Sequence, residues 1–201
     1  VFLKDKNTRI IPYFSPRSET TTYLVFQQGG HEAALIDPSP LDHDLFTLIM
    51  QNELTITHVF VTHPEPYMRR AMRTLSRVYD FEIVCGESNV YAFENGCISG
   101  EGTIEVGTLQ VQTIPALPHS RSSFFYRLEE VVFTGAIIHA GTIGETGSAY
   151  SEALLIATVK DYIFTMDRHT LLLPSVGPPS TVAAERDLSP YYRERDPSSE
   201  E

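Results

Sequence analysis

The chain has 201 residues, with 26 acidic and 15 basic side chains and a formal net charge of −11. This length allows one domain with a sizeable core, and a hydrophobic share of 42% is ordinary for a globular protein. Because non-specific nucleic-acid binding needs clustered Lys and Arg, the acidic balance argues against a nucleic-acid partner. No run of 18 apolar residues occurs, so the sequence predicts neither a membrane-spanning helix nor a membrane partner.

The chain begins Val1-Phe2-Leu3-Lys4, without an initiator Met and without the basic region, apolar core and cleavage site of a signal peptide. Such a start is compatible with a removed tag or with a segment of a longer chain. The two cysteines, Cys85 and Cys97, do not form a C-x-x-C pair. We therefore expect a cytoplasmic protein with two reduced thiols.

The first half of the chain is predicted to alternate short strands with two helices. Pro12 in the first apolar run favours an edge strand, because proline cannot donate a ladder hydrogen bond. β-Branched and aromatic residues indicate the other strands, and apolar residues at helical spacing indicate the helices. In chain order we expect strands at 9–14, 21–26 and 33–36, a helix at 41–52, a strand at 57–62 and a helix at 67–79.

The second half is predicted to repeat this plan. We expect a strand at 82–85, a meander over 90–114, a hairpin of 123–128 and 131–134, a helix at 151–164, a strand at 171–173 and a helix at 180–187 with Ser180 as N-cap. Two such halves, packed sheet to sheet with helices outside, form an α+β four-layer αββα sandwich. The domain is expected to span 1–192, and the charged segment 193–201 to be disordered.

Polar segments follow five of the predicted strands, on the rim where α/β folds place their sites. They are Asp37; Thr62-His63-Pro64-Glu65-Pro66-Tyr67-Met68; Pro118-His119-Ser120-Arg121-Ser122-Ser123; Val132-Phe133-Thr134-Gly135-Ala136; and Leu173-Pro174-Ser175-Val176-Gly177-Pro178-Pro179-Ser180-Thr181. In order and spacing they resemble the first Asp, T-H-x-H-x-D-H, G-H-[ST]-P-G-S, F-T-G-D and P-G-H-G-P-x-T of metallo-β-lactamase-fold proteins of the glyoxalase-II-like type. The resemblance covers about residues 20–192 and implies the αββα fold.

The resemblance also implies which positions would hold two divalent metal ions. His63 and His119 match metal-binding histidines of the family. The other ligand positions are changed: Glu65 stands for a His, Tyr67 for an Asp, Met68 for a His, Ala136 for the bridging Asp and Val176 for the last His. Phenol, thioether and apolar groups cannot replace carboxylates and imidazoles around such a cation, so we expect the dinuclear centre to be lost.

The first hypothesis is therefore a degenerate, non-catalytic domain, a pseudoenzyme that binds an unknown small molecule or protein and needs no cofactor. Its pocket would be formed by the rim residues Asp37, Tyr67, Met68, Ala136 and Val176. A homodimer and fusion to other domains both stay open. Because the chain ends soon after the last motif, we expect no counterpart of the helical domain with which glyoxalase II binds its glutathione thioester.

The alternative is a hydrolase of esters or thioesters, with one zinc, manganese or iron ion held by His63, Glu65 and His119. Two imidazoles and one carboxylate form a chemically reasonable mononuclear set. A third hypothesis is metal-free catalysis with His119 as base and Tyr67 as acid, since histidine titrates in the useful pH range.

Simpler interpretations stand beside these. Asp37, before Pro38, is interpreted as a turn former or an anchor for loop amides, and Glu65 as a first-turn residue that the helix dipole favours. The Gly-rich segment 141–147 lacks the Lys of a P-loop and is interpreted as a loop over the pocket. The histidines interpreted as structural are His31, His43, His58, His139 and His169. One side of the second helix carries Arg69, Arg70, Arg73 and Arg77, which form either a solvated face or an anion-binding strip.

Overall fold

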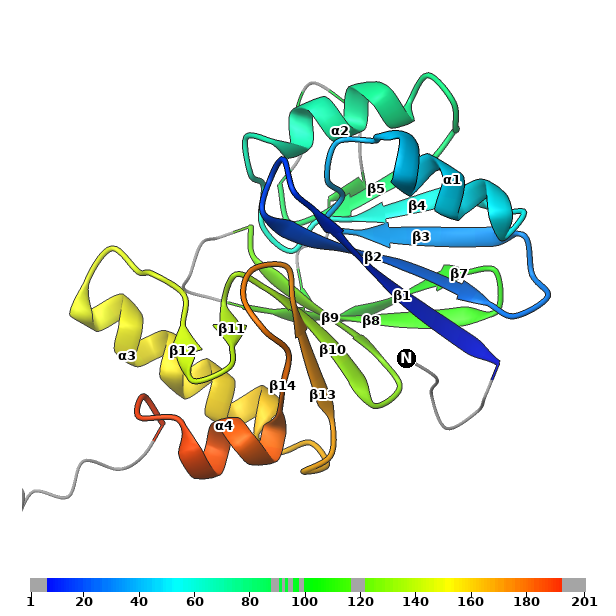
Figure 1. Ribbon diagram of the computed structural model, residues 1–201. Helices are drawn as coiled ribbons and strands as arrows, with labels where there is room; N and C mark the ends of the chain where they lie inside the picture. Colours follow the sequence, from blue (N-terminus) through cyan, green and yellow to red (C-terminus); the bar gives the residue numbers. More distant parts are fainter. Residues whose placement is uncertain are drawn as a thin grey trace, which may run out of the picture.

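The computed structural model describes residues 7–87, 91, 93, 96–97, 100–116 and 122–192, and contains two six-stranded sheets with helices outside them (Figure 1). This is the predicted four-layer αββα sandwich. Two sequence predictions, His119 as a site residue and 193–201 as a disordered tail, lie outside the described residues. No helix in the described part of the chain is long and apolar enough to cross a membrane.

The first sheet comes from the N-terminal half of the chain. Its strands, in spatial order, are β1 (Thr8–Ser15), β2 (Thr20–Gln27), β3 (Glu32–Ile36), β4 (Thr55–Phe60), β5 (Glu82–Cys85) and β6 (Gly96–Cys97). The first three strands pair antiparallel, and β3 to β6 pair parallel. Pro12 lies in the edge strand β1, as its missing N–H group predicts.

The second sheet comes from the C-terminal half. Its strands, in spatial order, are β14 (Ser180–Thr181), β13 (Leu171–Pro174), β10 (Val131–Gly135), β9 (Phe124–Leu128), β8 (Leu109–Pro115) and β7 (Gly102–Val106). Only the β10–β13 pair among these is parallel. A small hairpin, β11 (Ile138–His139) and β12 (Thr142–Ile143), follows β10 and belongs to neither sheet.

Helices form the two outer layers. The first sheet is covered by α1 (His43–Gln51) and α2 (Met68–Leu75), and the second by α3 (Ala149–Thr158), its π-helical continuation η2 (Val159–Ile163) and α4 (Val182–Leu188) (Figure 1). Asp42 caps α1, because its Oδ1 accepts a hydrogen bond of 3.0 Å from the Leu45 backbone N–H. The Tyr13 hydroxyl donates to Oδ2 of the same carboxylate at 2.6 Å, which ties α1 to the first sheet.

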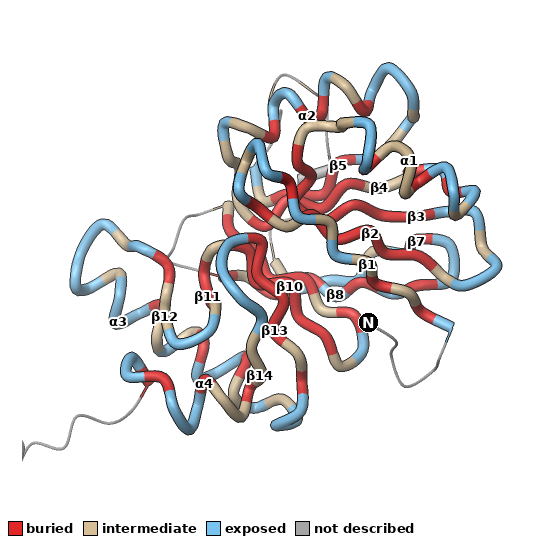
Figure 2. Tube along the Cα trace, in the orientation of Figure 1, coloured by how far each residue is buried: buried red, intermediate tan, exposed pale blue. Residues whose placement is uncertain are grey.

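Three apolar layers hold the sandwich together, and the buried positions follow the strands of both sheets (Figure 2). Aromatic pairs cross the space between the sheets: Tyr23 lies 5.2 Å from Phe133, and Phe60 lies 5.0 Å from Tyr126, between ring centroids. The Tyr126 hydroxyl donates to the backbone oxygens of Val61 and Val84, at 2.8 and 3.0 Å. The sheets are therefore joined by polar bonds as well as by apolar contact.

Two local predictions are wrong. The N-cap of α4 is Thr181, whose hydroxyl accepts a hydrogen bond of 3.1 Å from the Ala184 N–H, whereas Ser180 lies in β14. Glu65 is not in the first turn of a helix, because α2 begins at Met68. The Glu65 backbone oxygen accepts from Met68 N at 3.0 Å, so the residue belongs to the turn that leads into α2.

Candidate functional site

The carboxyl ends of β3, β4, β10 and β13 meet at one rim of the sandwich. Thr62, just after β4, accepts a backbone hydrogen bond of 2.9 Å from the Phe124 N–H of the opposite sheet. Gly135, at the end of β10, has φ +59°, and a Cβ placed there would lie 2.2 Å from the Thr62 hydroxyl oxygen. Only glycine therefore fits this close approach of the two sheets.

Asp37 is the buried anchor of this rim. Its Oδ1 accepts a 2.8 Å hydrogen bond from Thr62 N–H, its Oδ2 a 2.7 Å bond from the Thr62 hydroxyl, and the Ser175 side chain also bonds to the carboxyl group. Burial raises the pKa of Asp37 to about 6, although these hydrogen bonds lower it and the charge of Glu65 raises it further. The residue is 1% exposed and has φ +49°. Asp37 is thus an anchor for loop groups, as predicted.

His63 lies next to this anchor and is half-buried. Its Nδ1 lies 3.2 Å from the Ser123 hydroxyl oxygen, which adds a further polar contact between the two halves of the sandwich. Desolvation lowers the pKa of His63, and the charge of Glu87 opposes this effect. The imidazole therefore favours its neutral form near pH 7.

The rim holds a two-part cavity, which we call the rim cavity. The smaller part, of about 160 Å³, is lined by Thr62, His63, Glu65, Tyr67, Met68, Ala136, Ser175 and Val176. The larger part, of about 650 Å³, is lined by His63, Glu65, Ala136, His139, Thr142, Ile143, Gly144, Glu145 and Tyr191. The two parts share three lining residues. The structure thus brings together four of the five predicted pocket residues, while Asp37 lies beneath the cavity.

Tyr67 and Met68 contribute a phenol and a thioether to the cavity, in place of the carboxylate and imidazole expected at a metal site. Met68 is 1% exposed and packs in the core between the first sheet and its helices. Burial, and then the charge of Asp37, raise the pKa of Tyr67 well above its ordinary value, although a hydrogen bond to Thr20 opposes the shift. The phenol therefore stays protonated, which makes it a weak proton donor at neutral pH.

His139 lines the larger part of the cavity, although the sequence indicated a structural role. Its ring packs against Gly177, where φ is +80° and an added Cβ would lie 2.8 Å from the His139 Nδ1. The hydroxyl of Thr142 lies 2.6 Å from the same nitrogen. The hairpin β11–β12 thus folds over the rim, and segment 141–147 contributes Thr142, Ile143, Gly144 and Glu145 to the wall, as the predicted loop over the pocket. The sequence gives one signal for His139, its position three residues after Ala136.

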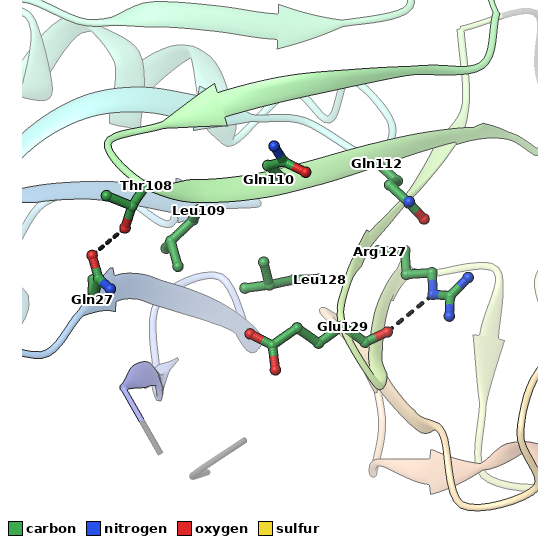
Figure 3. A pocket seen from close by; sticks show the side chains of 8 residues that line it. All are labelled: Gln27, Thr108, Leu109, Gln110, Gln112, Arg127, Leu128 and Glu129. Atoms are coloured by element: carbon green, nitrogen blue, oxygen red, sulfur yellow. Dashed lines mark hydrogen bonds between the residues drawn. The ribbon is translucent and has the colours of Figure 1, made fainter. Parts of the chain in front are cut away.

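A second cavity, of about 430 Å³, lies at the end of the sandwich opposite to the rim. Figure 3 shows the side chains that line it. Its walls include Gln27 at the end of β2 and Glu129 after β9. These polar groups already have partners within the chain: Thr108 donates to the Gln27 side chain, and Arg127 Nε donates to the Glu129 backbone oxygen at 3.0 Å. The Glu129 carboxylate also accepts a 3.1 Å hydrogen bond from the Thr8 hydroxyl, so both Gln27 and Glu129 are engaged within the chain.

The described residues of the rim do not supply the ligand set of the dinuclear metal centre that the resemblance implies. Within the described part of the chain, no three His, Cys, Asp or Glu side chains are placed to hold one metal ion. The implied second site offers Tyr67, Met68, Ala136 and Val176, whose side chains are not ligands for a borderline or hard dication. Two of the three residues of the predicted mononuclear set, His63 and Glu65, line the same cavity, and His119 lies outside the described residues.

The two-sheet architecture is shared with solved structures. ETHE1 from Myxococcus xanthus superposes with a TM-score of 0.81 and 25% identity, over 90% of this chain and 83% of that one. The BLEG-1 B3 metallo-β-lactamase superposes with a TM-score of 0.78 and 20% identity, over 93% of this chain and 100% of that one. The chain therefore has the metallo-β-lactamase-like αββα fold.

The chain also has relatives at the level of sequence. An uncharacterized protein of Treponema pallidum is 31% identical over 170 residues, which are 84% of this chain and 90% of that protein. The probable metallo-hydrolase YqgX of Bacillus subtilis is 28% identical over 97 residues, which are 47% of this chain and 46% of that protein. No family model matches the sequence.

Proposed function

We propose that this chain is a metallo-β-lactamase-fold domain that has lost its dinuclear metal centre and acts as a non-catalytic domain binding a small molecule or a protein. One observation carries the proposal. The four positions that the family resemblance assigns to the second metal site, Tyr67, Met68, Ala136 and Val176, line one small cavity and offer no imidazole or carboxylate. A cavity walled in this way favours the contact of an organic group over the coordination of a cation.

The remaining polar groups of the rim support a structural role. The Asp37 carboxylate is saturated by Thr62 and Ser175, so it is not available to place a water molecule. The Tyr67 phenol is held protonated by burial. A family-type hydrolase needs a metal-bound water whose pKa is lowered to ~7, and this donor set does not support one.

Metal analysis tests the proposal. Protein purified without chelator, and then incubated with zinc, manganese or iron salts, is expected to hold less than about a tenth of an equivalent after desalting. Ester and thioester substrates are expected to be hydrolysed no faster than by the Glu65→Gln variant. A tightly held pair of ions, or hydrolysis that depends on Glu65, would contradict the proposal.

A second candidate is a one-metal hydrolase that uses His63, Glu65 and His119. Its support is the position of His63 and Glu65, which line both parts of the rim cavity. It predicts about one ion per chain, with zinc–nitrogen and zinc–oxygen distances of ~2.0–2.2 Å in a zinc-soaked crystal. Release of that ion by both Glu65→Ala and His119→Ala would favour this candidate over the non-catalytic domain.

A further inference from the structure

Among its described lining residues, the rim cavity carries negatively charged side chains and no Lys or Arg. Glu65 lines both of its parts and Glu145 lines the larger part, whereas no Lys or Arg is among the described lining residues. The carboxyl group of Asp37 lies directly beneath, bonded to Thr62 of the cavity wall. A bound metal ion balances carboxylates that lie beside it, but here the donor set leaves these carboxylates unbalanced.

Glu65 is the centre of this imbalance. Its side-chain carboxylate has no hydrogen-bond or ion-pair partner within the described part of the chain, although the residue is only partly exposed. Its charge also contributes to the raised pKa values of Asp37 and Tyr67, after the larger effect of burial. A partly desolvated carboxylate without a partner is unfavourable, and a cationic ligand would relieve that cost.

Apolar and aromatic walls lie beside these charges. Met68 and Val176 line the smaller part of the cavity, and Tyr191 lines the larger part. The two parts have volumes of about 650 and 160 Å³, which is enough room for a small organic molecule. The cavity therefore suits a ligand that has a charged head and a carbon chain.

We propose that the rim cavity binds an organic cation, an amine with an alkyl chain, whose ammonium group lies against the Glu65 carboxylate where the family holds a metal ion. This proposal rests on the loss of the metal centre proposed above. The alkyl part lies against Met68 and Val176, and Glu145 adds a second acceptor at the wider end. The ammonium group thus supplies the positive charge that the changed ligand set no longer recruits from solution.

Calorimetric titration with three four-carbon probes tests this inference: 1,4-diaminobutane, 1,4-butanediol and succinate. The probes have similar length and differ in charge. We expect the diamine to bind at least about tenfold more tightly than the diol, and succinate not to bind, in protein kept metal-free with chelator. Glu65→Gln and Glu145→Gln are each expected to weaken diamine binding, Glu65→Gln by about tenfold. The control Glu152→Gln, on the exposed surface of α3 and outside both cavity linings, should bind like the parent chain.

Equal binding of diamine and diol, or an unchanged affinity of a folded Glu65→Gln variant, would overturn the inference. The unfolding midpoint of each variant shows whether it is folded. Zinc titration of a separate sample, from which the chelator has been removed, tests the underlying proposal independently. Tight zinc binding would contradict the proposal that the metal centre is lost. If the metal-free protein does not bind the diamine, only the proposal of an organic cation is contradicted.

Discussion

Thr62 donates two hydrogen bonds to one carboxylate, from its backbone N–H to Asp37 Oδ1 at 2.8 Å and from its hydroxyl to Oδ2 at 2.7 Å. Its own backbone oxygen accepts from Phe124 in the other sheet. One residue thus joins the end of β3, the end of β4 and the start of β9.

Thr62→Val tests this junction, because it removes one donor from a buried carboxylate and keeps the shape of the side chain. We expect a loss of about 1–3 kcal/mol in the free energy of unfolding, measured by urea titration. Thr165→Val, at an exposed position after η2, is the matched control and should change the free energy by less than about 0.5 kcal/mol. Equal effects at the two positions would contradict the assigned role of Thr62.

Asp37 should make stability depend on pH. Burial raises its pKa from 3.8 to about 6 in the folded chain, so the folded state binds the proton more tightly than the unfolded state. Its contribution to stability is complete below pH 3.8 and is lost as the pH rises through about 6. The span corresponds to roughly 3 kcal/mol at most.

Asp37→Asn removes this titration, and the measurement is the difference in unfolding free energy between the two chains across pH 4 to 7. We expect the parent chain to lose stability relative to the variant as pH rises through this window. A pH-independent difference would show that Asp37 keeps an ordinary pKa.

Gly135→Ala tests the close approach of the sheets. The added Cβ would lie 2.2 Å from the Thr62 hydroxyl oxygen, in addition to the strain of φ +59°. We expect a loss of more than about 3 kcal/mol in unfolding free energy. Gly141→Ala is the control, because φ is +78° there and no atom lies within 4 Å, so only the backbone strain of about 1 kcal/mol remains. A similar loss at both glycines would exclude the contact with Thr62 as the cause.

Leu155→Ala tests the packing of α3 on the second sheet. Leu155 is fully buried, whereas its neighbour Leu154 is 42% exposed. We expect Leu155→Ala to cost about 2–5 kcal/mol and Leu154→Ala less than about 1 kcal/mol, both measured by urea unfolding. The reverse order would mean that α3 presents its other face to the sheet.

The layers of the fold could be predicted because the longer strands of both sheets have a strong local pattern. The predicted strand 82–85 coincides with β5, since its buried apolar residues end at Gly86. The predicted strand 57–62 ends instead at Phe60, because the Thr62 N–H leaves the ladder to bond the Asp37 side chain. Local periodicity contains no information about that long-range hydrogen bond.

The site could be predicted only in part. Motif spacing placed His63, Glu65, Tyr67 and Val176 on one rim, and in the structure all four line one cavity. His139 was missed because its place in the wall depends on the hairpin β11–β12, whose strands of two residues are too short to show a period. The N-cap at Thr181 was missed because Ser180 is an equally good capping residue in sequence.

The residues that fasten the rim are not the residues that face the cavity. Asp37, Thr62 and Gly135 join the strands through buried bonds and close contact, whereas positions 67, 136 and 176 contribute side chains to the cavity wall. Residues at the cavity-facing positions can therefore be substituted while the contacts between the strands are kept. Such a division lets one scaffold replace its chemistry without dismantling its architecture, and makes these wall positions the natural place to install a new specificity by design.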